Sequence, residues 1–205
     1  AVADEVSRRS ITLLEDERGH VPLRVPRRAA VLYLSLLDYP SGWRIAAPSR
    51  TFQPQLQKRW PDLTAVELSD RSTPNELDLV RTMASRFDAI VAGVFVRTAS
   101  FSGRMDLAPP LVRLLQDLAR MTAPRDVPFV TVFFGNPYAA TFLPELPAVL
   151  LTYDFSDRAE VSAVRALAGE APIGGRLPIT LPGRFPVGHG LDRPGPASGS
   201  RPGIR

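Results

Sequence analysis

The sequence predicts an α/β fold, in which a mostly parallel sheet carries helices on both faces as an α/β sandwich. Several runs of apolar residues lack a polar face, which is typical of strands that are covered on both sides. Segments with helical periodicity alternate with these runs, as in repeated strand–helix–strand units. The chain has 205 residues, of which 44% are hydrophobic, and this is enough for one sizeable core.

The first elements lie between the N-terminus and residue 37. Residues 2–10 are predicted to form a short helix, an apolar run follows at 11–14, and the polar residues 16–19 are typical of a turn. The first strong strand is predicted at 29–37, because its sequence, AAVLYLSLL, is apolar on both faces.

The next elements are a helix at 49–60, a shorter strand at 63–68 and a second helix with clear boundary signals. Thr73 is suited to the N-cap of this second helix, Pro74 to its first position and Glu76 to a capping box. The apolar residues of the helix recur at helical spacing and predict one buried stripe. This stripe consists of Leu77, Val80, Ala84 and Phe87.

A second strand without a polar face is predicted at 89–96. Pro109 and Pro110 open another helix, and further strands are predicted at 127–134 and 148–153. The helix that begins at these prolines has four leucines on one face. They are Leu111, Leu114, Leu115 and Leu118.

The last helix is predicted to begin at Asp157 as its cap, with Glu160 completing a capping box and Gly169 ending the helix. Residues 178–181 predict a late strand. Beyond Leu191 the sequence DRPGPASGSRPGIR is rich in Pro, Gly and Ser. We expect residues 192–205 to be a disordered tail without a core of its own.

Composition excludes several kinds of site. The chain has no cysteine, so disulfides, thiolate nucleophiles and cysteine-based metal centres are excluded. It has only two histidines, His20 and His189, which excludes a histidine-rich metal centre. We therefore expect neither a metal nor a cofactor.

Charge and hydropathy argue against two classes of partner. The net charge is +4, and the arginine pairs at 8–9 and 27–28 are isolated, whereas a nucleic-acid interface needs clustered basic residues with aromatics between them. No run approaches the ~20 apolar residues that a membrane span requires, and residues 1–10 lack the pattern of a signal peptide. We expect no nucleic-acid or membrane partner, and the compartment stays open.

Polar side chains follow three of the predicted strands. In open α/β sheets, ligands usually bind outside the carboxyl ends of the strands, so these side chains are the candidates for contact with a substrate or a partner. Arg97 offers a planar set of donors for a carboxylate, a phosphate or paired hydroxyls. The alternative is that these residues only form caps, turns and local ion pairs. The candidates are Arg97, Thr98, Ser100, Asn136, Tyr138 and Asp154.

Known catalytic patterns are absent from the sequence. The residues after Leu37 match neither the glycine-rich dinucleotide motif nor a phosphate-binding loop, and no G-x-S-x-G elbow occurs. His20 lies in a predicted turn and His189 near the tail, which is more typical of structural histidines. Asp88, Asp154 and Asp157 all have ordinary turn or capping interpretations, so no pair of catalytic carboxylates can be chosen. We predict no catalytic residue in this chain.

Four segments nevertheless resemble one enzyme family, across roughly residues 5–191. RRSITLLEDERGHVPL resembles the segment that enters the second domain of family 3 glycoside hydrolases, and EAPIGGRLPITLPGRFPVGHGL resembles the end of those enzymes. Between them, DAIVAGVFVRTASFSGRMDLAPPLVRLLQDLA and PFVTVFFGNPYAATFLPELPAVLLTYDFSD are similar to the intervening strands and helices. The GNPY and GRLP…GHGL parts point to the bacterial β-N-acetylglucosaminidase-like branch.

The resemblance implies a domain without its own catalytic residues. In this family a preceding barrel supplies an aspartate nucleophile, and in the N-acetylglucosaminidase branch also a histidine-containing loop with a K-H-[FI]-P-G-H-G pattern. Residues 188–190 share only the letters GHG with that pattern and lack its lysine, first histidine and proline, so they receive no catalytic role. The second domain packs on the barrel, and in some members it lends loops to the sugar cleft.

Two functional hypotheses follow from this resemblance. In the first, residues 1–10 are a linker helix from an upstream domain and 11–191 form the non-catalytic second domain of a family 3 glycoside hydrolase. Its partner is a catalytic barrel in cis or in trans, and contact with carbohydrate is left open. In the second, the chain is a stand-alone α/β binding or interaction module that has lost the barrel. A barrel encoded upstream would favour the first hypothesis and a start codon there the second.

Overall fold

The sheet has six strands and confirms the predicted fold class. The computed structural model describes residues 2–37, 48–96, 107–143 and 145–196. The strands lie in the order β1-β6-β5-β4-β2-β3, and every neighbouring pair is parallel except β1 with β6. They are β1 (Thr12–Asp16), β2 (Val31–Leu37), β3 (Leu63–Ser69), β4 (Ala89–Val96), β5 (Phe129–Gly135) and β6 (Ala148–Leu151).

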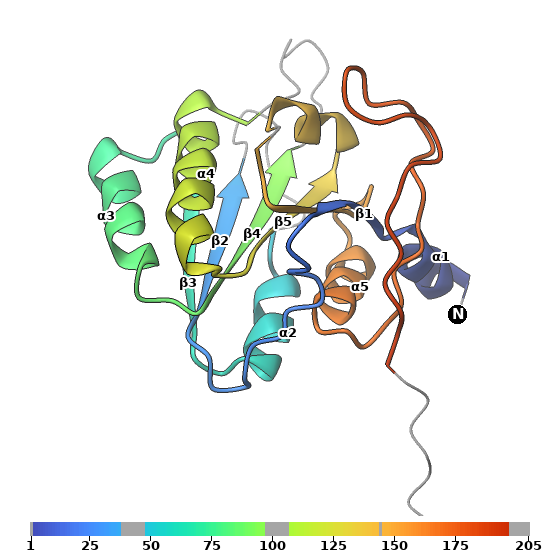
Figure 1. Cartoon of the computed structure of the whole chain (residues 1–205), viewed down its shortest axis with the longest axis horizontal. Helices are drawn as coiled ribbons and strands as arrows, with labels where there is room; N and C mark the ends of the chain where they lie inside the picture. Colours follow the sequence, from blue (N-terminus) through green and yellow to red (C-terminus); the bar gives the residue numbers. More distant parts are fainter. Residues whose placement is uncertain (1, 38–47, 97–106, 144, 197–205) are drawn as a thin grey trace, which may run out of the picture.

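Helices cover both faces of this sheet (Figure 1). α3 and α4 pack on one face, α2 and α5 pack on the other, and α1 lies against α5. The helices are α1 (Val2–Ser10), α2 (Phe52–Arg59), α3 (Pro74–Ala84), α4 (Pro109–Thr122) and α5 (Asp157–Leu167), with short 3-10 helices η2 (Ala123–Arg125) and η3 (Pro137–Phe142). Among the described residues, no helix is long and apolar enough to cross a membrane.

The two-sided apolar strands divide the core into two clusters. Every residue of β2 and of β4 is buried. In β2, Leu34 and its neighbours two residues away pack towards α3 and α4, whereas Tyr33 and Leu37 pack towards α2 and α5. Because successive side chains of a strand point to opposite faces, a strand in the middle layer needs apolar residues throughout.

The predicted capping box of α3 and the predicted buried faces of α3 and α4 are confirmed. The Thr73 hydroxyl accepts a hydrogen bond from the Glu76 N–H, and the Glu76 carboxylate accepts one from the Thr73 N–H, so the capping box forms. The predicted stripe of α3 is buried. The four leucines predicted for one face of α4 are also buried, each with 0% of its surface exposed.

Three predictions about local structure need correction. The N-cap of α5 is Ser156, whose hydroxyl accepts from the Ala159 N–H, and Asp157 is the first helical residue. Residues 178–181 form no strand; only an isolated bridge joins Leu181 to Phe185. The apolar run that begins at Ile11 continues into β1, an edge strand that the sequence pattern alone did not distinguish.

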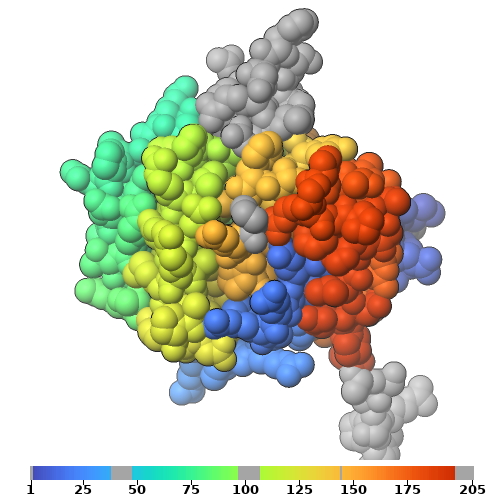
Figure 2. Space-filling model, turned by 45° about the horizontal axis from the view of Figure 1, so that its top comes forward, coloured from blue at the N-terminus to red at the C-terminus, as the bar shows by residue number. Residues whose placement is uncertain are grey.

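The predicted boundary of the tail, at residue 192, lies too early. Arg193 forms a β-bridge with Ile173, and its guanidinium donates to the buried carboxylate of Asp16 at 2.7 Å. Asp192 pairs with Arg176 at 2.7 Å. We call residues 170–196 the closing segment; in Figure 2 it covers one continuous area beside residues near β1. The final residues, 197–205, lie outside the described residues.

Candidate functional site

The carboxyl ends of β4, β5 and β6 meet at one edge of the sheet, as the candidate site required. These strands are parallel neighbours, so their carboxyl ends lie on the same side of the sheet (Figure 1). Of the six predicted contact residues, Arg97, Thr98 and Ser100 lie outside the described residues. The other three follow β5 and β6.

Asn136 and Tyr138 shape the segment after β5. The Asn136 side chain accepts a hydrogen bond from the Tyr138 N–H at 3.0 Å and thereby caps η3. The amide nitrogen of Asn136 is buried and has no partner among the described residues. Tyr138 is half-buried and packs against the core on the α3 and α4 face. The side-chain oxygen of Asn136 thus has a structural role as a helix cap, while its NH2 group has no acceptor among the described residues.

Among the described residues, the carboxylate of Asp154 makes only local hydrogen bonds, although Asp154 is exposed at the same edge. Its carboxylate accepts from the N–H of Phe155 at 2.7 Å and from the Ser156 hydroxyl at 2.5 Å. The preceding residue, Tyr153, has a left-handed backbone with φ 61°. Asp154 therefore fixes the turn that leads into α5, which fits the local alternative for this residue.

A buried carboxylate that the sequence assigned to a local cap lies beside the same edge. Glu160 is 2% exposed, and its carboxylate accepts from the N–H groups of Ser49, Thr51 and Phe52 at 3.0, 2.8 and 2.6 Å. These N–H groups lie at and just before the start of α2, where the helix dipole favours a negative charge. Burial raises the pKa of Glu160, and the three N–H donors lower it in part. Glu160 thus joins α5 to the start of α2.

Three hydroxyl groups extend this polar cluster into the sheet. The Ser49 hydroxyl lies 2.5 Å from the hydroxyl of Tyr33 and 2.7 Å from that of Ser35. Burial raises the pKa of Tyr33 far above its ordinary range, so its hydroxyl stays protonated. Ser35 and Ser49 line a cavity of about 380 Å³ next to β3. The hydroxyls satisfy one another, so the cluster acts as a support for the segment that enters α2.

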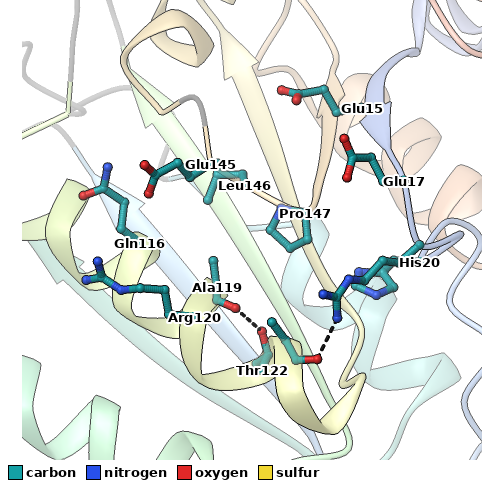
Figure 3. A pocket seen from close by; sticks show the side chains of 12 residues that line it. Glu15, Glu17, His20, Gln116, Ala119, Arg120, Thr122, Glu145, Leu146 and Pro147 are labelled. Carbon is teal, nitrogen blue, oxygen red and sulfur yellow. Dashed lines mark hydrogen bonds between the residues drawn. The ribbon is translucent and has the colours of Figure 1, made fainter.

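A second cavity lies at the opposite, amino edge of the sheet, between α4 and the end of β1 (Figure 3). Its volume is about 390 Å³, and Glu15, Glu17, His20, Gln116 and Glu145 are among the residues that line it. Sequence reasoning missed this site because its residues come from separate elements without a shared motif. The one signal was His20 itself, which the sequence placed in a turn.

His189 has the structural role that its sequence context favours. Its Nε2–H donates to the backbone oxygen of Leu14 at 2.9 Å, and its ring stacks on Phe185 with centroids 4.3 Å apart. Arg184, from the same part of the closing segment, pairs with Glu15 of β1. These contacts attach the closing segment to β1.

The described side chains do not form a metal centre. No group of three or more His, Asp or Glu residues within the described ranges could hold a metal ion. At the carboxyl edge, the described candidates are an amide, a phenol and a carboxylate held in a turn. They can bind a polar surface or hydroxyl groups, and they offer no nucleophile paired with a base.

Comparison with known proteins gives structural neighbours but no sequence relatives. No family model matches the sequence, and no curated protein is significantly similar to it. A fungal multi-domain GH3 β-N-acetylglucosaminidase aligns over 91% of this chain with a TM-score of 0.71 and 22% identity. A glycoside hydrolase family 3 β-N-acetylglucosaminidase from Paenibacillus sp. str. FPU-7 aligns over 91% with a TM-score of 0.68 and 20% identity. A β-glucosidase from Listeria innocua aligns over 85% with a TM-score of 0.64 and 16% identity.

In each case the chain corresponds to a small part of a longer polypeptide. It spans 19% of the fungal chain, 32% of the Paenibacillus chain and 25% of the Listeria chain. At these identities the likeness concerns the fold. The chain therefore has the α/β fold of a segment found in glycoside hydrolase family 3 chains.

Proposed function

We propose that this chain is the non-catalytic second domain of a family 3 glycoside hydrolase of the β-N-acetylglucosaminidase type, and that it packs on a catalytic barrel. The observation that carries this proposal is that nearly all of this chain aligns with only a small part of each matched chain. Two β-N-acetylglucosaminidase chains align over 91% of this chain, which spans only 19% and 32% of theirs. The upstream residues 1–10 would then be the linker helix from the barrel.

The contacts between the two distinctive sequence segments support the proposal. The entering segment, ITLL, supplies Leu13, whose carbonyl accepts a hydrogen bond from the Leu191 N–H at 2.8 Å. Within the closing segment, the Leu177 N–H donates to the His189 carbonyl at 2.8 Å. The sequence features that resemble the family at both ends of the domain are thus hydrogen-bonded to each other.

We further propose that the carboxyl edge is the surface that meets the barrel and borders the sugar cleft. Tyr138 is half-buried there and packs against the core with only part of its side chain. Phe142, at the end of η3, is 45% exposed, and Arg184 of the closing segment donates to the carbonyl oxygens of the same region. An exposed aromatic ring beside polar donors is a composition typical of interfaces.

Enzymatic assays of the chain with and without a barrel test the proposed role. The chain alone is expected not to hydrolyse aryl β-N-acetylglucosaminides or aryl β-glucosides, because no nucleophile and acid/base pair can be assigned in it. Addition of a family 3 barrel domain should give a complex on size-exclusion chromatography. Turnover by the chain alone, abolished by a point mutation within it, would overturn the non-catalytic assignment.

A pair of double variants tests the proposed surface. Replacing Arg97 and Tyr138 together with alanine should weaken association with the barrel by at least ~10-fold while the chain stays folded. The matched control replaces Met121 and Arg125, which lie at the other edge, with alanine. Equal association of both double variants would contradict the assignment of the carboxyl edge, and no association of the unmodified chain would contradict the domain assignment.

A further inference from the structure

The cavity at the amino edge contains a buried histidine nitrogen that lacks a partner. His20 is 6% exposed and is one of the residues that line the cavity. Its Nδ1 lies 3.3 Å from the Phe129 N–H, which donates to it. The same Nδ1 also lies 3.4 Å from the Phe129 carbonyl oxygen, to which it donates in the other tautomer. In either tautomer the Phe129 backbone therefore occupies Nδ1 and leaves Nε2 for another partner.

The Nε2 atom of His20 has no hydrogen-bond partner among the described residues. The nearest carboxylate oxygen, Oδ1 of Asp126, is 3.9 Å away, beyond hydrogen-bond distance, and its side chain is 80% exposed. Buried polar atoms in native structures usually find a partner, so the cavity is suited to a hydroxyl group of a bound molecule at this point, since a hydroxyl can accept from or donate to this nitrogen.

The charged groups of the cavity leave carboxylates in excess. Arg120 pairs with Asp117, and Arg18 pairs with Asp126 at 3.7 Å while it donates to the Ala123 carbonyl at 2.6 Å. Glu15 pairs with Arg184. By contrast, neither of the exposed carboxylates Glu17 and Glu145 has a hydrogen bond or an ion pair within the described part of the chain.

These two carboxylates lie on opposite sides of the cavity. Figure 3 shows Glu17 on one side and Glu145 on the other, with Leu146 and Pro147 between them. The cavity thus offers apolar side chains, two carboxylates and one unpartnered ring nitrogen. A ligand that matches it carries a positive charge, a compact carbon frame and a hydroxyl oxygen.

We propose that the amino-edge cavity binds a small protonated amino alcohol. Its ammonium group is attracted by Glu17 and Glu145, one hydroxyl group forms a hydrogen bond with His20 Nε2, and its carbon frame lies on Leu146 and Pro147. The volume of about 390 Å³ suits a molecule of this size. This proposal is independent of the barrel and of the family assignment.

Three probes that share one tetrahedral carbon frame separate the contributions. Tris carries an ammonium group and three hydroxyls, pentaerythritol replaces the amine by a fourth hydroxymethyl group, and tert-butylamine lacks the hydroxyls. The full chain is titrated in phosphate buffer at pH 7, and the ring signals of its two histidines are followed by NMR. His189, which contacts Leu14 and Phe185 instead of the cavity, serves as the internal reference.

Tris is expected to shift the His20 ring signals saturably, with a Kd of ~1–10 mM, and to leave those of His189 unchanged. Pentaerythritol and tert-butylamine should each bind at least ~5-fold more weakly. No saturable shift at His20 would overturn the site. Equal binding of pentaerythritol would overturn the ammonium contact, and equal binding of tert-butylamine would overturn the hydroxyl contact with His20.

Charge-neutral variants test the two carboxylates without disturbing the core. The double variant Glu17→Gln/Glu145→Gln should weaken Tris binding at least ~5-fold, with the His189 signals confirming an unchanged fold. The matched control is Glu67→Gln, an exposed carboxylate on β3. A double variant that binds Tris as tightly as this control would overturn the proposal.

Discussion

Glu160 connects two helices because its side chain accepts hydrogen bonds from the main chain at the start of another helix. Its carboxylate accepts three N–H groups around the start of α2, while its own backbone belongs to α5. Those N–H groups have no partner within α2, since the first turn of any helix leaves its donors free. A carboxylate is the strongest acceptor that the chain can place there.

Replacing this carboxylate by an amide tests its contribution. Glu160→Gln should lower the free energy of unfolding by about 2 kcal/mol, because the amide offers one oxygen where two were used and places an NH2 group against N–H donors. Urea unfolding followed by circular dichroism measures the change. Asp157→Asn, an exposed position of the same helix, is the control and should change stability by less than ~0.5 kcal/mol. Equal effects would show that Glu160 adds nothing beyond a surface charge.

Gly93 is required by the Tyr33 side chain. A Cβ at position 93 would lie 2.7 Å from the Tyr33 hydroxyl oxygen and 3.1 Å from the ring of Phe95. Gly93→Ala should therefore destabilise the protein by about 1–3 kcal/mol, since the crowded β4 strand cannot easily move. In a Tyr33→Phe background the closest atom is gone, so the same substitution should cost less. A double-mutant cycle measured by thermal unfolding checks this, and an unchanged cost would contradict the contact.

At the scale of single residues, the sequence predicted the contacts that form within one turn of chain. The Thr73–Glu76 capping box forms as predicted because both partners lie three residues apart. Asp157 and Glu160 were predicted to form a similar local pattern, yet Glu160 turns to α2, because N–H groups from a distant part of the chain offered it better partners. The His20 environment likewise depends on Phe129, more than a hundred residues away, which no local pattern can reveal.

The revised start of α5 can be tested directly. Ser156→Ala removes the hydroxyl that accepts from the Ala159 N–H and should cost about 1 kcal/mol. Asp157→Ala should cost less, because Asp157 is the first helical residue and its exposed pair with Arg50 contributes little. Chemical unfolding of the two variants decides between the two assignments; a larger loss for Asp157→Ala would restore Asp157 as the cap.

At the scale of helices and strands, the elements with the most buried apolar residues were the ones that the sequence predicted. The strands without a polar face and the helices with one apolar stripe were located from their patterns because burial determines both. β1 was not distinguished as a strand, because an edge strand of five residues depends on its pairing with β6. Residues 178–181 have a sequence typical of a strand, but within the described residues only an isolated bridge joins them to another segment, at Leu181 and Phe185.

For the whole molecule, the closing segment can be examined with two truncations. Deleting residues 197–205 should leave the melting temperature nearly unchanged, since their sequence offers little apolar surface. Deleting residues 192–205 should cost about 3 kcal/mol, because Asp16 would lose the cation that pairs with its buried carboxylate. Calorimetry of both truncated chains measures the difference. Equal melting temperatures would show that Arg193 does not support the core.

Topology predicted the carboxyl edge as the candidate site. As that prediction required, β4, β5 and β6 are parallel neighbours, so their carboxyl ends meet at one edge. The role of each side chain was less predictable. Asp154 is used in a turn and Asn136 partly in a cap, because short polar side chains after a strand can bond to their own backbone as easily as to a partner. The amino-edge cavity arises only when β1, α4 and the segment before β6 come together.

The pairing of the first strand with the last part of the chain has a consequence for synthesis on the ribosome. β1 needs β6 and, through Leu13, residue 191, so its hydrogen-bond partners appear only after residues 148–191 have been translated. Until then the apolar residues around Leu13 and Leu14 stay uncovered on a nascent chain, where such segments attract chaperones or other nascent chains. The parallel β2–β5 unit can assemble earlier. Folding of this domain in the cell should therefore finish with β1 and the closing segment.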